Sequence, residues 1–323
     1  MTDSARPNHA SLIRQALDDS SGGASSALAA SWRRSMTLYG LDPTDSGPVE
    51  TITEQQLNLA RETAEPMVRA SDLVLDRLYQ AVGGVGCCVL LTNASGVPLE
   101  RRGAPADDAT FQRWGLWPGA VWSEATEGTN GIGTALVERS PVIIHREQHF
   151  HARNTAMSCV THPLFDHKGQ LVGALDVSSC RADATESLLN LISTTVADAA
   201  RTIEAMMFRQ AFADARIIIV NGAEDRNPAA LLAVDRYDLV IGASRLARRM
   251  LQITDEQIGA LLPASKFLIP AAAETDLEDA ERGAIRRALS KNSGNVSAAA
   301  RTLGISRATL HRKLNRLGLK DLH

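Results

Sequence analysis

The side chains best suited to chemistry gather near the C-terminal end of the chain. Six residues within a ten-residue stretch carry donors or positive charge that match phosphates and base edges: Arg307, Thr309, His311, Arg312, Lys313 and Arg316. Residues 282–320 contain 10 Lys and Arg and no Asp or Glu, whereas the rest of the chain carries a net charge of −13. This asymmetry favours a nucleic-acid contact confined to one end, although a solvated surface helix would show the same charges.

Two short helices would position these side chains. Apolar residues recur at i, i+4 and i+7 over residues 296–303 and again over 310–317, on either side of Gly304. Asn295 and Ser306 each stand where a side chain can cap the first turn of a helix. Two helices that share one core across a glycine turn form a helix-turn-helix, whose second helix fits the major groove. We expect Asn295 and Ser306, together with the six residues above, to contact DNA, with Arg307 nearest the bases. A small basic bundle that binds protein is the alternative.

A second group of candidate residues lies in the middle of the chain. Trp114, Trp117 and Trp122 fall within nine residues of a chain that is 4% aromatic, and several glycines follow them. Such a stretch is typical of a loop-rich wall around a small-molecule cavity with a few converging polar groups. The polar candidates for ligand binding are Glu127, Asn130, His145 and His149. Taken one by one, these tryptophans could equally be ordinary core residues and the glycines ordinary turns.

The same region does not favour catalysis or a metal. Five of the eight histidines lie within 23 residues, but they do not form the HExxH pattern and there is no paired CxxC. Cys87 and Cys88 are neighbours in a predicted strand, so they would point to opposite faces. Asp176 has no Ser and His partners at a suitable spacing. The sequence therefore predicts no catalytic residue, no metal ligand and no cofactor.

Strand and helix signals alternate along the rest of the chain. Two hairpins are expected, one over residues 86–102 and one over 163–179, with a single strand at 141–145 between them. A helix over 54–78 should break or kink at Pro66. Strands are expected at 216–220 and 231–240, and helices at 243–251 and 255–262. A long helix over 185–213 has an apolar seam suited either to a core or to a coiled-coil partner. We expect this helix to hold a homodimer. The residues of the seam are Leu188, Ile192, Val196, Ala199, Ile203 and Met206.

Four segments resemble known families. GNVSAAARTLGISRATLHRKLNRLGL resembles the Fis-type helix-turn-helix. WGLWPGAVWSEATEGTNGIGTALVERSPVIIH and the residues that follow resemble the GAF sensor domain of the acetoin-catabolism-regulator family. SWRRSMTLYGLDP resembles the N-terminal segment of that family, and LLAVDRYDLVIGASRLARRML resembles the opening of a PAS domain. The resemblance implies an α+β GAF domain, with an antiparallel sheet, flanking helices and a pocket over one face of the sheet.

The expected fold is therefore α+β with a C-terminal all-α domain. The boundaries are an N-terminal helical segment at 1–70, a GAF domain at 71–213, a truncated PAS-like segment at 214–263, a linker at 264–276 and the helix-turn-helix domain at 277–323. Members of the family usually carry an ATPase domain before the helix-turn-helix, which needs a GxxxxGK[ST] phosphate loop. The sequence contains no such motif, so we expect no ATPase activity.

These features together predict a non-enzymatic transcriptional regulator. It would bind a double-stranded operator as a homodimer and sense a small alcohol, aldehyde, ketone or aromatic, with RNA polymerase as a further candidate partner. A metal, haem or redox sensor is one alternative, and an interaction protein that modulates a full-length homologue is another. Four cysteines suggest a reducing cytoplasm rather than a disulfide framework. No apolar run approaches the ~20 residues of a membrane-spanning helix.

Overall fold

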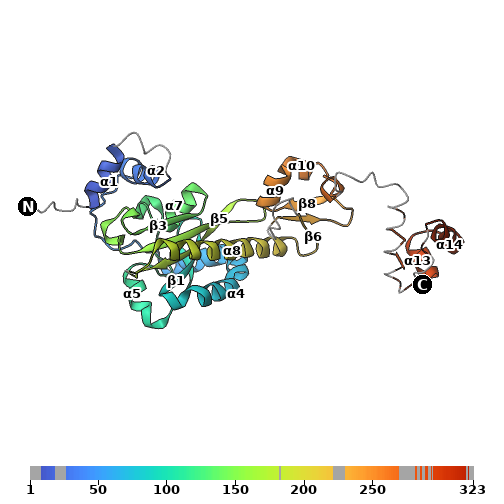
Figure 1. Ribbon diagram of the computed structural model, residues 1–323, viewed down its shortest axis with the longest axis horizontal. Helices are drawn as coiled ribbons and strands as arrows, with labels where there is room; N and C mark the ends of the chain where they lie inside the picture. Colours follow the sequence, from blue (N-terminus) through green and yellow to red (C-terminus); the bar gives the residue numbers. More distant parts are fainter. Residues whose placement is uncertain are drawn as a thin grey trace, which may run out of the picture. The chain divides into compact units, whose positions relative to one another are not determined.

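The computed structural model in Figure 1 divides the chain into two compact units, residues 1–264 and 265–323. It describes residues 9–18, 27–181, 183–220 and 230–268, and, in the second unit, residues 281, 284–285, 288–289, 292, 294–317 and 319. Most of the linker expected at 264–276 and most of the helix expected before Gly294 lie outside the described residues.

An antiparallel five-stranded sheet forms the centre of the first unit. Its spatial order is β2-β1-β5-β4-β3. The strands are β1 (Cys87–Asn93), β2 (Pro98–Arg102), β3 (Val142–His145), β4 (Ser158–Phe165) and β5 (Leu171–Ser179). Both predicted hairpins are present, and β4 begins five residues earlier than expected. Because successive side chains of a strand point to opposite faces, Cys87 packs on one side of the sheet and Cys88 on the other, as predicted.

Long helices cover one face of this sheet (Figure 1). They are α3 (Glu54–Thr63), α4 (Glu65–Val82) and α8 (Glu186–Ala211). Pro66 lies in the first turn of α4, so the predicted break separates two helices. The seam of α8 lies inside the core of its own chain: Ile192 is 4% exposed, Val196 1% and Ile203 0%. The expectation that this seam holds a dimer is therefore wrong, because the spacing of apolar residues identifies a buried face but not what covers it.

Short helices and loops cover the opposite face. They are η3 (Pro105–Asp107), α5 (Asp108–Arg113), α6 (Glu124–Glu127), α7 (Gly131–Glu138), η4 (Arg146–Gln148) and η5 (Ala152–Asn154); η2 (Gly83–Val85) leads into β1. A second apolar cluster joins them to the sheet and includes Leu90, Leu116, Trp122 and Ile132. The N-terminal helices α1 (His9–Asp18), α2 (Ala27–Arg33) and the π-helix η1 (Arg34–Leu38) complete this side.

A small second sheet follows α8. Its strands β6 (Arg216–Ile219), β7 (Leu231–Val234) and β8 (Val240–Ala243) pair antiparallel in that order, with α9 (Arg245–Leu251) and α10 (Asp255–Gly259) beside them. The single strand expected at 231–240 is wrong, because a turn at Asp235–Asp238 ends β7 and Val240 starts a new strand. Phe208, near the end of α8, packs against Leu231 and Ala233 of this sheet.

The second unit contains α11 (Ser265–Leu268), α13 (Val296–Thr302) and α14 (Arg307–Arg316). Leu310, Leu314 and Leu317 bury one face of α14 against Ala299 and Ala300 of α13. Throughout the described parts of the chain, every helix is too short or too polar to cross a bilayer.

Candidate functional site

The three tryptophans expected in a ligand wall lie on the loop side of the sheet. Trp122 is 1% exposed, sits in the apolar cluster there and donates its indole N–H to the carbonyl of Gly115 at 2.8 Å. Trp114 is half-buried against the same cluster. Trp117 is half-buried, with the guanidinium of Arg101 4.6 Å from its ring centre. The structure brings the tryptophans to one layer, where their rings pack within the chain.

Glu127 and Asn130 both have defined partners in the loop before α7. The Glu127 carboxylate accepts two hydrogen bonds from Arg153 Nη2, at 2.7 and 2.8 Å, and one from Asn154 at 3.2 Å. Burial raises the pKa of Glu127, and Arg153 opposes that shift. Asn130 caps α7, because its Oδ1 accepts the N–H of Gly133 at 2.8 Å. Both side chains fix the shape of the loop.

His145 and His149 approach the sheet from the end of β3 and the turn that follows. The Nδ1 atom of His145 lies 2.8 Å from Ser158 Oγ. His149 is fully buried, with Nδ1 3.0 Å from the carbonyl oxygen of Arg146 and Nε2 3.4 Å from Cys159 Sγ. Burial lowers the pKa of His149 to about 4, so its imidazole is neutral near pH 7.

A buried polar cluster lies on this face of the sheet and was missed by the sequence reasoning. Asp176 is 0% exposed and accepts hydrogen bonds from the hydroxyls of Thr161 at 2.5 Å and Ser178 at 2.6 Å. The Ser178 hydroxyl also lies 3.1 Å from Cys159 Sγ, which connects the cluster to His149. Burial raises the pKa of Asp176 to about 6. Polar residues within two apolar strands, at 161, 176 and 178, were the available signal.

The start of α7 lies directly on this cluster. A Cβ atom at Gly131 would lie 2.5 Å from Thr161 Oγ and 2.6 Å from Cys159 Cβ. A Cβ at Gly133 would lie 2.4 Å from the backbone nitrogen of Glu124. Two glycines of the TNGIGTA segment are therefore needed for close packing rather than for a turn.

A second cluster missed by the sequence reasoning joins the N-terminal segment to the same loop. The buried carboxylate of Glu124 accepts hydrogen bonds from Arg34, at 2.5 and 3.1 Å, and from Ser31 at 2.8 Å. Ser31 Oγ also lies 2.7 Å from Thr129 Oγ and 3.2 Å from Thr134 Oγ. This network joins the SWRRS segment to the SEATEGTNGIGT segment through buried hydrogen bonds.

The predicted DNA-binding residues lie on α13 and α14 of the second unit or at the starts of these helices. Asn295 Oδ1 accepts the N–H groups of Ser297 and Ala298, at 3.1 and 3.0 Å, and Ser306 Oγ accepts the N–H of Thr309 at 3.1 Å. These contacts cap α13 and α14, and Gly304 between them has φ +68°. The sequence-predicted caps are therefore confirmed.

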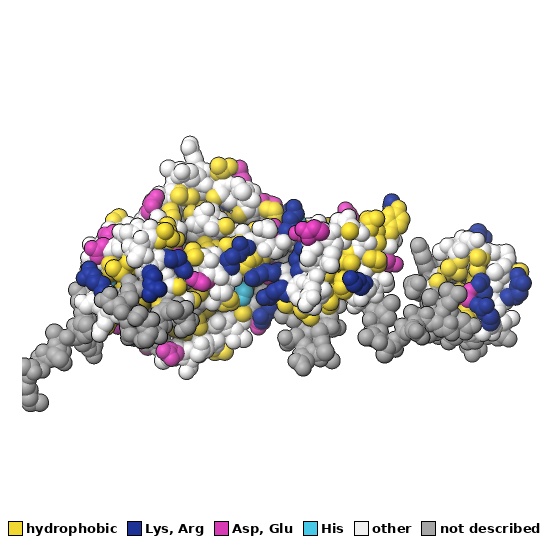
Figure 2. Space-filling view, turned by 90° about the horizontal axis from the view of Figure 1, so that it is seen from above, with side chains coloured by type: hydrophobic (Ala, Val, Ile, Leu, Met, Phe, Trp, Pro, Cys, Tyr) yellow, Lys and Arg dark blue, Asp and Glu magenta, His cyan; other side chains and the backbone are white. Residues whose placement is uncertain are grey.

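The arginines and the lysine of α14 differ in their partners. Arg307, Arg312 and Arg316 are exposed, and so is His311. Lys313 and Arg316 both pair with Glu281, so two of the side chains expected at DNA share one acidic partner within the chain. Figure 2 shows Lys and Arg side chains across the visible face of this unit. Within the described residues, no three His, Cys, Asp or Glu side chains form a group that could hold a metal ion.

Two family models match the chain. Residues 66–203 match the GAF domain, and residues 276–317 match the bacterial regulatory protein, Fis family. The acetoin catabolism regulatory protein of Cupriavidus necator is 34% identical over 225 residues, which cover 69% of this chain and 34% of that protein. The acetoin dehydrogenase operon transcriptional activator AcoR of Bacillus subtilis is 28% identical over 54% of this chain and 28% of its own length. This chain thus spans about a third of the length of these relatives.

One solved structure has a similar fold over most of this chain. The crystal structure of the Escherichia coli DhaR(N)-DhaL complex aligns with a TM-score of 0.54 and 16% identity, over 81% of this chain and 86% of that chain. At this identity the match concerns the fold alone.

Proposed function

Since the chain combines a GAF domain with a Fis-type helix-turn-helix and is homologous to acetoin catabolism regulators, we propose that it is a DNA-binding transcriptional regulator. Its C-terminal unit binds specific operators, and its GAF domain responds to a small organic metabolite. Its homologues are named as regulators of transcription, and this supports a role other than catalysis.

The geometry of α14 is the observation that carries this proposal. Two capped helices share one apolar core, which leaves the opposite face of α14 to solvent. Arg307 lies in the first turn of that helix and Arg312 further along it, both exposed. A helix of this kind places its N-terminal side chains at base edges in the major groove. Thr309 and His311 lie between them, within reach of the same groove.

We propose that the effector binds on the loop side of the GAF sheet, near Trp114, Trp117, Trp122 and α7. A mainly apolar layer with buried hydroxyls at Thr161 and Ser178 suits a small alcohol, aldehyde, ketone or aromatic. Every predicted contact residue already packs or bonds within the chain, so the effector would exchange some of these contacts for its own. Such an exchange favours one conformation over another, which is what a ligand-driven switch requires.

We also propose that the protein acts as a homodimer in the cytoplasm, with RNA polymerase as a further partner. A single helix-turn-helix reads few base pairs, and operators with two-fold symmetry need two readers about one helical turn apart. The buried seam of α8 is unavailable for this contact, so another surface must form the dimer. Sedimentation equilibrium at micromolar concentration tests the dimer, and a monomer there would contradict it.

Mapping of the DNA sites in the genome, followed by binding assays on the recovered sequences, tests the function. The full chain should bind these sites specifically, and a chain without residues 277–323 should not. Specific binding that survives this deletion would overturn the proposal.

A metabolite identified from the neighbouring genes should raise the free energy of unfolding by about 2.7 kcal/mol at a hundredfold excess over its dissociation constant. Trp114→Ala is the better probe of the pocket, because Trp122 is a core residue whose truncation would cost about 3–5 kcal/mol.

A further inference from the structure

Four arginines lie near one another where the GAF domain meets the small sheet. Arg139 follows α7, Arg201 lies on α8, and Arg245 and Arg249 lie one turn apart on α9. Figure 2 shows Lys and Arg side chains gathered between these two parts of the first unit. Outside residues 282–320 the chain carries a net charge of −13, so a cluster of positive charge is unusual in this part of the molecule.

Arg245 is the centre of the cluster. Its guanidinium carbon lies 3.6 Å from the ring centre of Phe165, and that of Arg139 lies 5.7 Å from the same ring. Burial and the charges of Arg249 and Arg139 lower the pKa of Arg245. The three guanidinium groups are thus close enough to repel one another, a cost that a bound anion would offset.

The nearby carboxylates do not balance these charges. Arg201 pairs with Asp198 on its own helix. Glu204 lies near Arg245, but it accepts the backbone N–H of Phe165 at 3.0 Å and forms no ion pair in the described part of the chain. Burial raises the pKa of Glu204 to about 7, so it carries only part of a negative charge at neutral pH.

The other three arginines can be reached by a ligand. Within the described residues, Arg139, Arg245 and Arg249 form no ion pair. Arg139 and Arg249 are exposed. The guanidinium nitrogens of Arg245 have no hydrogen-bond partner there, and none of them is buried. An arginine that lies over an aromatic ring keeps the N–H groups at its edge free to donate.

A phosphoryl group matches this arrangement better than a carboxylate does. It carries a charge of about −1.5 to −2 near pH 7 and presents three acceptor oxygens. A carboxylate carries a single charge on two oxygens. Guanidinium groups bind phosphate oxygens in pairs of parallel hydrogen bonds, so three of them can surround one phosphoryl group. A nucleic acid fits less well, because the acidic surroundings repel a long polyanion.

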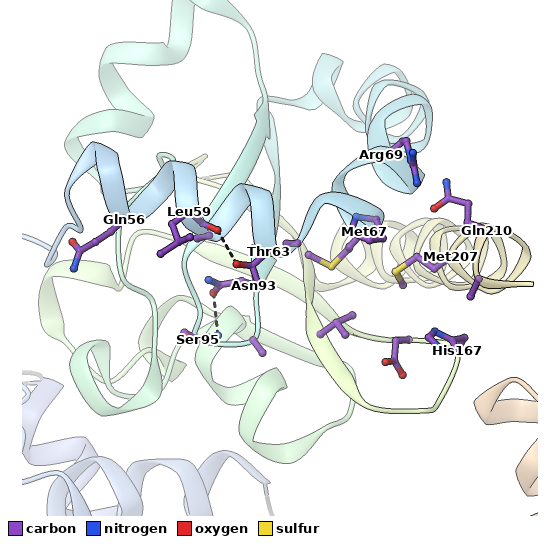
Figure 3. Close-up of a pocket in the computed structure, with 17 residues that line it drawn as sticks. Gln56, Leu59, Thr63, Met67, Arg69, Asn93, Ser95, His167, Met207 and Gln210 are labelled. Carbon is purple, nitrogen blue, oxygen red and sulfur yellow. Dashed lines mark hydrogen bonds between the residues drawn. The ribbon is translucent and has the colours of Figure 1, made fainter. Parts of the chain in front are cut away.

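We propose that Arg139, Arg245 and Arg249 form an anion site that binds the phosphoryl group of a small phosphorylated molecule or of inorganic phosphate. The edge of the Arg245 guanidinium would donate to the phosphoryl oxygens, with Arg139 and Arg249 on either side. None of the seven residues expected to bind the effector belongs to this site. The site is also separate from the apolar groove at the junction of α3 and α4 (Figure 3), which none of the three arginines lines.

An occupant of this site would connect two parts of the first unit. Arg139 extends from the end of α7 in the GAF domain, whereas Arg245 and Arg249 belong to α9 beside the small sheet. A bound phosphoryl group would therefore hold α9 to the GAF domain. Only an effect of this contact on operator affinity rests on the proposed function; the binding itself does not.

Two probes of nearly the same shape test the site on the full chain. Phenyl phosphate carries about two negative charges at pH 7.5, and phenyl sulfate has the same ring and three terminal oxygens with one charge less. We expect phenyl phosphate to bind at least tenfold more tightly in calorimetric titrations at constant ionic strength. Because both probes carry the same ring, any contact of that ring with the apolar groove cancels in the comparison. Equal affinities, or no binding of phenyl phosphate, would overturn the proposal.

Arginine variants locate the site. Arg249→Gln and Arg139→Gln, both at exposed positions, should each lower the affinity for phenyl phosphate at least fivefold while circular dichroism shows an unchanged fold. Arg236→Gln is the matched control, because it removes the same charge from an exposed arginine that lies 4.7 Å from the ring centre of Tyr237, in the turn between β7 and β8. This control should bind as the natural protein does. If all three variants lose affinity equally, the effect is one of net charge and the proposal fails.

Competition identifies the group that is bound. Inorganic phosphate should displace phenyl phosphate, and benzoate at the same concentration should not. Equal displacement by benzoate would contradict the preference for a phosphoryl group. Inorganic phosphate that binds as tightly as phenyl phosphate would identify the free ion as the ligand, and weaker binding would identify an organic phosphate; both results support the site. Phenyl phosphate binding that leaves operator affinity unchanged would contradict only the link to regulation.

Discussion

Single residues of α14 have different expected effects on DNA binding. Arg307→Ala should weaken binding to the operator by about 1–3 kcal/mol and reduce the preference over random DNA, because this side chain is exposed in the first turn. Lys313→Ala should weaken all sequences alike and flatten the salt slope by at most about one, because its ammonium already pairs with Glu281. Anisotropy titrations between 50 and 200 mM salt measure both effects. A uniform loss in Arg307→Ala would contradict the base contact.

Asp176 gives a prediction about pH. Burial raises its pKa from 3.8 to about 6 in the folded protein. The fold therefore favours the protonated carboxyl, so the contribution of Asp176 to stability is complete below about pH 4 and is lost as the pH rises through 6.

Asp176→Asn should accordingly be more stable than the natural protein at pH 7.5, by up to about 3 kcal/mol, with a difference that shrinks toward zero at pH 4. Urea unfolding across this range tests the prediction. Thr161→Val removes one hydroxyl of the cluster but keeps the acid, and should retain the pH dependence. A difference between Asp176→Asn and the natural protein that does not vary with pH would show that Asp176 does not titrate with the fold.

The elements of the fold follow largely from local patterns in the sequence. The hairpin expected over residues 86–102 is present, with its turn at Asn93–Gly96, and Pro66 predicted the break between α3 and α4. The caps at Asn295 and Ser306 predicted the starts of α13 and α14. In each case the residues that begin or end the element lie within a few positions of it along the chain.

Local sequence patterns did not predict contacts between elements that are far apart in the sequence. The pairing of Ser31 and Arg34 with Glu124 joins residues about 90 positions apart, and no periodicity reports it. The buried cluster at Asp176 likewise depends on the register between β4 and β5. For the same reason the candidate ligand residues were identified by type alone, and their partners within the chain could not be seen.

Neighbouring positions on α8 differ sharply in burial, because only its seam faces the core. Ile192→Ala should lower the free energy of unfolding by about 2–5 kcal/mol, because Ile192 is 4% exposed in the core against the sheet. Leu191→Ala, one residue away and 67% exposed, should change it by less than about 0.5 kcal/mol. Denaturant unfolding of both variants provides the comparison. Equal effects would mean that the helix is covered differently in solution.

Residues outside the family match pack on the GAF domain and supply partners for its buried groups. The family model begins at residue 66, yet Glu124 depends on Arg34 for its charge partner. Arg34→Leu should destabilise the first unit by about 3–5 kcal/mol, because a carboxylate with 0% side-chain exposure loses its ion pair.

Arg33→Leu is the matched control, since Arg33 is the exposed neighbour on α2. Its melting temperature should stay close to that of the natural protein, whereas that of Arg34→Leu should fall by several degrees. If both variants melt together with the natural protein, the N-terminal segment does not pack on the domain in solution.

The length of α8 has a consequence for which changes in this chain are tolerated. One helix of 26 residues places Ile203 and Met207 in one core and Phe208 in another. Each residue added to a helix turns everything beyond it by about 100° and advances it by 1.5 Å. A single insertion between Ile203 and Phe208 would thus rotate the phenyl ring away from Leu231 and bring a different face of the helix under the small sheet. The effect of a substitution along α8 on stability depends on how buried the side chain is. A change in the number of its residues would instead alter the rotation of the small sheet relative to the five-stranded sheet.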